Sequence, residues 1–134
     1  KVVAERLKMA LSQKLIRVLC DECKQAYRPH PKLLQKVGLP PETKVLYRPP
    51  QKTEEGEPEF CKKCSSIGYY GRTGLIQAIE LSDAVKKLVN AGADPRQIKS
   101  QARKESMQSF QSDGIRLVAE GKTSLEELQR VFKR

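Results

Sequence analysis

The sequence contains no tryptophan and a single histidine, and aromatic residues occupy only 5% of its 134 positions. It has no apolar run near the roughly 20 residues that a membrane-spanning helix needs. Its first ten residues, KVVAERLKMA, have none of the apolar core of a signal peptide. We therefore expect a cytoplasmic chain without membrane insertion, and, because the apolar residues are aliphatic, helices with thin cores rather than a large sheet.

Recognisable catalytic motifs are also missing. The sequence contains no phosphate-binding GxxxxGK[ST] loop, no GxSxG nucleophile elbow and no histidine-based acid–base arrangement. We therefore expect no enzymatic activity from this chain alone. The chain does not begin with methionine, and its first residues already lie within a periodic pattern, so we expect it to be a piece of a longer protein.

Acidic residues are outnumbered, with 26 Lys and Arg against 16 Asp and Glu, and the formal net charge is +10. A basic surface can keep a protein soluble, or it can attract phosphates, anionic lipid or an acidic partner. The chain has no Arg-Gly repeats and few aromatic side chains that could stack on bases. This composition favours solubility or a protein partner over nucleic acid.

The pattern of apolar residues divides the chain into three predicted parts. Residues 1–19 are predicted to form an amphipathic helix, with an apolar stripe at i, i+4 and i+3 steps made by Val3, Leu7, Leu11, Leu15 and Val18. Residues 20–81 contain seven prolines between Cys23 and Cys61, and these prolines exclude long helices. Within them we expect a short helix at 32–37 ended by Gly38, a strand at 45–47, a mobile loop at 51–59 and a strand at 75–81.

Residues 82–134 have the signals of a small helical bundle. Ser82 is a predicted N-cap, and Asp94 precedes a proline at the first position of the next helix. Another helix is expected to end at Gly121, and Ser124 with Glu127 has the spacing of a capping box. The predicted fold class is therefore mainly α, with a small α+β subdomain, which contains all four cysteines of the chain, preceding the bundle.

Two CxxC pairs, Cys20 with Cys23 and Cys61 with Cys64, give the most specific chemical signal. Each pair places two thiolates on one turn, and two such turns supply the four ligands of a tetrahedral structural zinc ion. Disulfides are disfavoured because nothing marks the chain as secreted. A thioredoxin-like redox site expects one CxxC pair, and an iron–sulfur cluster is less typical of paired CxxC turns.

Other residues near the cysteines have less specific roles. Lys24, Lys62 and Lys63 are neighbours of the cysteines in sequence. They could keep the thiolates deprotonated, or they could simply be exposed lysines. His30, between two prolines, is expected to be a surface residue rather than a ligand.

Four segments together resemble a known family: ALSQKLIRVLC (10–20) with its CxxC turn, the second CxxC turn, GYYGRTGLIQAIEL (68–81) and SDGIRLVAEGKTSLEEL (112–128). They are similar to the C-terminal region of the type II secretion and type IV pilus assembly ATPases. Lys14, Gln77 and Ser106 depart from residues common in that family. The resemblance leaves open whether a pilus or a secretion system is served.

The resemblance implies a parent that is a hexameric cytoplasmic motor of RecA-like fold, with ATP and magnesium bound in a part outside this chain. It implies that residues 1–19 leave the motor core and that Cys20, Cys23, Cys61 and Cys64 bind structural zinc. Expected partners are the rest of the ATPase, neighbouring subunits and inner-membrane platform or docking proteins, through which the motor is peripheral to that membrane. Arg17 and Arg72 are candidates for subunit or partner contacts. The alternative hypothesis is a free-standing basic zinc ribbon that binds nucleic acid.

Overall fold

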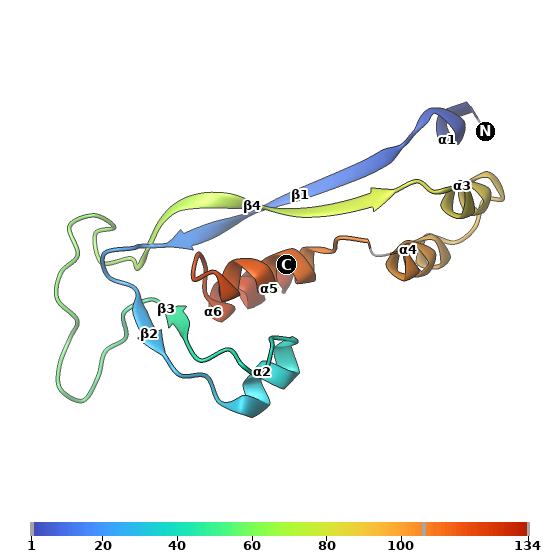
Figure 1. Ribbon diagram of the computed structural model, residues 1–134. Coiled ribbons are helices and arrows are strands. Elements are labelled where there is room, and N and C mark those ends of the chain that lie inside the picture. The colour runs from blue at the N-terminus through green and yellow to red at the C-terminus, as the bar shows by residue number, and fades with distance from the viewer. Residues whose placement is uncertain (1, 106, 134) are drawn as a thin grey trace. The chain divides into compact units, whose positions relative to one another are not determined.

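The computed structural model describes residues 2–105 and 107–133. Two two-stranded sheets and several short helices make up this part of the chain (Figure 1). One sheet pairs β1 with β4, and the other pairs β2 with β3. In chain order the elements are α1 (Val2–Arg6), β1 (Met9–Leu19), β2 (Gln25–Tyr27), α2 (Pro31–Val37), β3 (Leu46–Arg48), β4 (Tyr69–Glu80), α3 (Asp83–Asn90), α4 (Pro95–Lys104), α5 (Phe110–Ala119) and α6 (Leu125–Phe132).

The chain folds into two compact units, each built from two separate stretches of sequence. Unit 1 comprises Lys1–Lys14 and Ile76–Asp113, and unit 2 comprises Leu15–Leu75 and Gly114–Arg134. Strands β1 and β4 contribute to both units. This arrangement differs from the predicted division into 1–19, 20–81 and 82–134, because each unit joins segments that are distant in sequence.

The predicted helix over residues 1–19 is wrong. Only α1 is helical there, and residues from Met9 onward form the strand β1. A stripe repeated every four residues lies on one face of a helix, but it also lies on one face of a strand, whose side-chain period is two. The stripe is not the buried face, since Leu11 is 67% exposed whereas Ile16 is fully buried. Hydrogen bonding to β4 decided between the two conformations.

The predicted helical bundle over residues 82–134 also differs from the structure. Helices α3 and α4 belong to unit 1, α6 belongs to unit 2, and α5 extends across the boundary between the units. The helices of this segment are therefore shared between two units rather than gathered around one core. The fold does contain α-helices and small sheets, as expected.

Several local predictions are confirmed. Helix α2 ends at Gly38, which has φ of 77°. Ser82 caps α3, Asp94 caps α4, and both side chains accept a backbone N–H from the first turn of their helix. The segment from residue 75 to 80 is the second half of β4, which begins earlier than predicted. Capping and turn residues act locally, which is why the sequence alone predicts them well.

The core of unit 2 depends on a close approach between α5 and α6. A Cβ atom on Gly114 would lie 2.2 Å from Cδ1 of the buried Leu128, so the absence of a side chain lets the helices pack at this distance. The largest fully buried aliphatic side chains of unit 2 are those of Ile16, Leu46, Leu75 and Val118. The core is small and aliphatic, as the composition predicts.

Ser106, one of the departures from the family pattern, lies outside the described residues. Among the residues that the structure describes, no helix is long and apolar enough to cross a membrane.

Candidate metal centre

The four cysteines converge on one point in unit 2, and their Sγ atoms all lie within 4.8 Å of one another. The Sγ atoms of Cys20 and Cys61 are 3.8 Å apart, and those of Cys23 and Cys64 are 3.5 Å apart. Tetrahedral coordination with metal–sulfur distances of about 2.3 Å requires sulfur–sulfur separations of about 3.8 Å. The cluster therefore has the dimensions needed to hold one metal ion.

All four cysteines are free. A disulfide needs its sulfurs at about 2.05 Å, which is far shorter than the separations found here. The donor set is four soft sulfur atoms without a carboxylate or imidazole, a composition that suits zinc and leaves no ligand of another type in the site. His30 is engaged elsewhere, because its Nδ1 accepts the Lys32 N–H at the start of α2.

The two CxxC turns are held by backbone hydrogen bonds. Cys20 follows directly after β1, and its carbonyl accepts the Lys24 N–H at 3.0 Å. In the second turn, Ser66 donates its N–H to the Cys61 carbonyl, and its Oγ accepts the Cys61 N–H in return, both at 3.1 Å. Ser65 and Ser66 have φ of 51° and 61°, in a left-handed region that costs a non-glycine residue free energy. Closing this turn is therefore unfavourable by itself and needs compensation from its surroundings.

Gly68 joins the two cysteine pairs. Its N–H points at Sγ of Cys64, 3.3 Å away, while its carbonyl accepts the Cys20 N–H at 3.0 Å. Its φ is 83°, and a Cβ atom at this position would lie 2.7 Å from Cβ of Pro49. Both the backbone conformation and the available space therefore require glycine at this position.

Burial disfavours the thiolate form of most of the cluster. Cys20, Cys61 and Cys64 are buried, and burial raises the pKa of the Cys20 and Cys23 thiols. Burial opposes ionisation of Cys64 too, but the Gly68 N–H and the neighbouring thiols outweigh it and lower the pKa of Cys64 to about 7. A bound cation would therefore favour the thiolate form of Cys20 and Cys23, which burial opposes.

Two of the three lysines beside the cysteines have partners of their own. Nζ of Lys63 lies 2.7 Å from a carboxylate oxygen of Asp21. Nζ of Lys24 donates to the Gly121 carbonyl at 3.0 Å and lies over the Tyr47 ring. Lys62 is exposed. Their proposed effect on the thiolates stays a prediction.

A second polar cluster, which we call the Glu127 network, ties β1 to α6 within unit 2. Both Nε and Nη2 of Arg17 donate to Oε2 of Glu127, at 3.0 Å and 2.7 Å, and the Arg17 backbone N–H donates to Oε1 at 3.1 Å. Arg130 donates to the same carboxylate through two nitrogens, at 2.8 Å and 2.6 Å. The Arg17 guanidinium also lies 4.3 Å from the centre of the Tyr69 ring.

Glu127 is 1% exposed, so its carboxylate depends on these donors. Burial alone would favour the neutral acid, but the hydrogen bonds from Arg130 and Arg17 lower the pKa of Glu127 to about 2. Half of the predicted capping box forms, because Ser124 Oγ accepts the Glu127 N–H at 3.2 Å. The other half is replaced, since the Glu127 carboxylate binds the arginines instead.

The two arginines predicted as subunit or partner contacts have different environments. Arg17 binds Glu127 within its own chain, whereas Arg72 is exposed and makes no side-chain hydrogen bond or ion pair with a described residue. The structure thus gives Arg17 an intramolecular partner, and the predicted contacts with another subunit stay predictions. The sequence did not predict that Tyr69 would lie against Arg17, or that the Glu127 carboxylate would bind two arginines. The only sequence signal for Glu127 was its position in the capping box.

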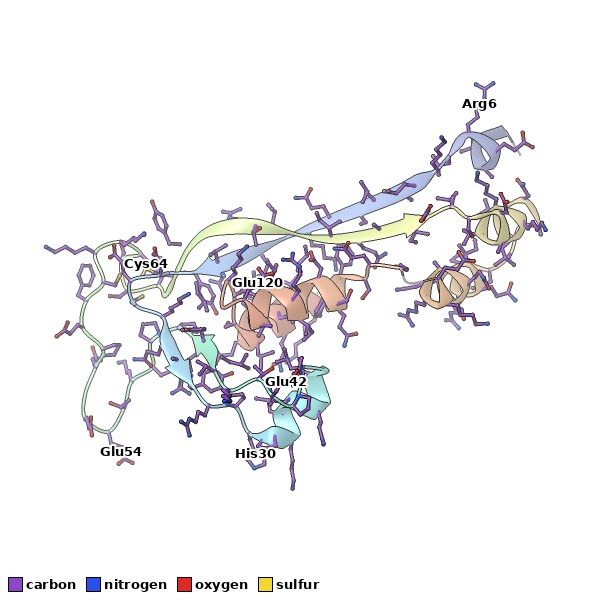
Figure 2. The ribbon with its side chains drawn as sticks, in the orientation of Figure 1. Arg6, His30, Glu42, Glu54, Cys64 and Glu120 are labelled. Atoms are coloured by element: carbon purple, nitrogen blue, oxygen red, sulfur yellow. The ribbon has the colours of Figure 1, made fainter. Side chains whose placement is uncertain are left out.

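Figure 2 shows Cys64 beside the other sulfur atoms of the cluster.

The chain is similar to known proteins along most of its length. A family model described as type II/IV secretion system protein matches residues 1–130. The type II secretion system ATPase E of Vibrio cholerae is 32% identical over 135 residues, which cover 98% of this chain and 24% of that protein.

Two other relatives have similar identities. The type IV pilus assembly ATPase PilB of Thermus thermophilus is 30% identical over 88% of this chain and 13% of its own length. The type II secretion system protein E of Pseudomonas aeruginosa is 33% identical over 92% of this chain and 23% of its own length. The chain therefore spans no more than about a quarter of these relatives.

Proposed function

The chain belongs to the type II/IV secretion system protein family, and we propose that it is the zinc-binding region of a motor that assembles a type IV pilus or drives type II secretion. In this proposal Cys20, Cys23, Cys61 and Cys64 bind one zinc ion whose role is structural. The observation that carries the proposal is the convergence of four sulfur atoms at separations suited to one tetrahedral ion.

The chain's own residues prepare the site for the metal. The Gly68 N–H points at one ligand sulfur, and the Gly68 carbonyl fixes the backbone of another ligand, Cys20. When bound, zinc supplies the positive charge that keeps four thiolates stable, three of them buried, and closes the loop between the two pairs. The loop is rich in proline and poor in buried side chains. Metal binding, rather than burial of apolar side chains, would therefore stabilise its folded conformation.

In the parent protein, this region would serve the motor without catalysing a reaction itself. ATP and magnesium would be bound in a part of the parent outside this chain, in the cytoplasm, and inner-membrane platform or docking proteins would receive the motion. The Glu127 network supports this role, because it connects β1 to α6 through charged hydrogen bonds and makes unit 2 a stiff element.

The direct test is elemental analysis of the chain purified under reducing conditions without chelator. We expect about one zinc per chain, and removal of zinc with a strong chelator should unfold unit 2. Cys61→Ser should lose the metal, whereas Lys62→Gln, a change at an exposed position between two ligands, should retain it. A metal-free chain with unchanged melting would refute the zinc proposal.

The remaining parts of the proposal have their own measurements. The purified chain should show no ATP turnover, and measurable hydrolysis would contradict its non-catalytic role. In the complete motor, Cys61→Ser should reduce pilus or secretion-system assembly more than ATP hydrolysis, and an equal loss of both would contradict a coupling role. A free-standing nucleic-acid-binding module would instead bind DNA or RNA at low salt and lose that binding steeply as salt rises.

A further inference from the structure

Helix α4 carries a stripe of positive charge, which we call the basic stripe: Arg96, Lys99 and Arg103. These residues recur at i, i+3 and i+7, and at about 100° per residue they fall within about 60° of the helix circumference. All three are exposed, and none forms an ion pair with another described residue. Like charges at these spacings repel one another, so the stripe lowers the stability of its own helix.

No acidic residue in the described part of unit 1 forms an ion pair with Lys99, the middle residue of the stripe. The opposite side of α4 contains Ile98 and the buried Ala102. The acidic residues of this segment lie at the two ends of the helix, where Asp94 accepts the Arg96 N–H and Glu105 accepts from Ser82 and Gln101. Every charged residue on the exposed side of α4 between its ends is therefore cationic.

Unit 2 presents a surface of opposite charge, which we call the acidic turn: Glu54 and Glu55. Thr53 and Gly56 exchange two backbone hydrogen bonds of 3.1 Å, which fold the chain into a tight turn with these carboxylates at its tip. Both side chains are exposed, and neither forms an ion pair with a described residue. Lys52, the nearest cation in the loop, pairs with Glu57 instead. In Figure 2, Glu54 lies at the outer end of the loop between β3 and β4.

We propose that the acidic turn of one copy of this chain docks on the basic stripe of a second copy. Two adjacent carboxylates can face two or three cations spread over the roughly 10 Å between Arg96 and Arg103. Arginine suits this role because its planar guanidinium binds a carboxylate through two parallel hydrogen bonds. The contact joins two different surfaces, so it is heterologous and can repeat around a ring or along a filament.

This interface goes beyond the zinc proposal and involves none of its ligands. Exposed ion pairs are weak one by one and are screened by salt. The association should therefore be visible at high protein concentration and low salt, and it should weaken as salt is added. Within a larger assembly, a high local concentration of neighbouring copies would strengthen it.

The test uses two variants of the full chain and their mixture in sedimentation equilibrium. Glu54→Lys/Glu55→Lys keeps the basic stripe but reverses the turn, and Arg96→Glu/Arg103→Glu keeps the turn but reverses the stripe. Each variant alone should associate about tenfold more weakly than the wild type. An equimolar mixture should regain association, because each variant then offers the surface that complements the other.

A matched control reverses two exposed lysines of α2 in Lys32→Glu/Lys36→Glu, which changes net charge by the same amount as the stripe variant. It should associate more like the wild type, and zinc content and helicity should be unchanged in all variants. A wild type that stays monomeric at low salt would overturn the proposal, and so would variants whose mixture fails to regain association. Binding of the stripe to anionic phosphatidylglycerol vesicles without self-association would overturn it in favour of a membrane surface.

Discussion

The two units of this chain supplement their aliphatic cores by different means. Unit 2 contains all four cysteines and the Glu127 network, so clustered thiols and charged hydrogen bonds bring together segments that are distant in sequence. Unit 1 has no cysteine and relies on apolar packing around residues such as Val85 and on well-capped short helices. A thin core is thus supplemented in unit 2 by clustered cysteines and charged hydrogen bonds, and in unit 1 by the N-caps of its helices.

The largest effect is expected from a cysteine variant. Cys20→Ser should destabilise unit 2 by at least about 3 kcal/mol, because metal binding in structural zinc domains is worth about 10–16 kcal/mol. Residue-resolved hydrogen exchange should show the loss mainly in unit 2. The matched variant in unit 1, Val85→Ala, should cost about 2 kcal/mol there and leave metal content unchanged. Equal loss of protection in both units of Cys20→Ser would remove the contrast between them.

The next largest effect concerns Gly68, which joins the cysteine pairs. Gly68→Ala should cost about 3 kcal/mol, because it adds a left-handed backbone conformation for alanine to a clash with Pro49. Gly71 is the control, since it has the same φ of 83° but no atom within 4 Å of the added Cβ. Gly71→Ala should cost only about 1 kcal/mol in chemical denaturation. Equal costs would show that the contact with Pro49 contributes nothing.

A smaller effect is expected from the Glu127 network. Glu127→Gln keeps the size of the side chain but leaves Arg17 and Arg130 without a counter-charge, so it should cost about 2 kcal/mol. The control is Glu120→Gln, whose partners Arg116 and Lys122 are exposed, and which should cost clearly less than Glu127→Gln because solvent screens exposed ion pairs. Urea denaturation of both variants measures the difference, and equal costs would contradict a special role for the buried carboxylate.

The same carboxylate predicts a pH dependence. Because the folded-state pKa of Glu127 is about 2 and its ordinary value is 4.5, its contribution is complete above about pH 4.5 and is lost as pH falls toward 2. Protonation of the cysteines also weakens metal binding in acid, so the wild type must be compared with Glu127→Gln. The stability difference between the two should shrink between pH 4.5 and 2, and a constant difference would contradict this assignment.

The smallest effect is expected at Arg72. Its side chain is exposed and makes no hydrogen bond or ion pair with a described residue. Arg72→Ala should therefore change the free energy of unfolding by less than about 0.5 kcal/mol. Thermal melting of the isolated chain measures this. A large loss would show that Arg72 stabilises the fold, and the predicted contact with another subunit would lose its support.

The sequence predicted the parts of the structure that depend on neighbouring residues. The caps at Ser82 and Asp94 and the end of α2 at Gly38 follow from local spacing. The predicted helix over residues 1–19 failed because β1 is decided by its hydrogen bonds to β4, which lies more than fifty residues away. Likewise, the second role of Glu127 depends on Arg17, 110 positions earlier in the chain, and no local pattern contains that information.

We have proposed that a metal ion held by the four cysteines stabilises unit 2. Hydrogen exchange resolved by residue, with and without a strong chelator under reducing conditions, tests it most directly. We predict that chelation removes about one zinc per chain and abolishes protection around the two CxxC turns and α6, while α3 and α4 keep most of theirs. Unchanged protection around the cysteines after complete metal removal would contradict the claim.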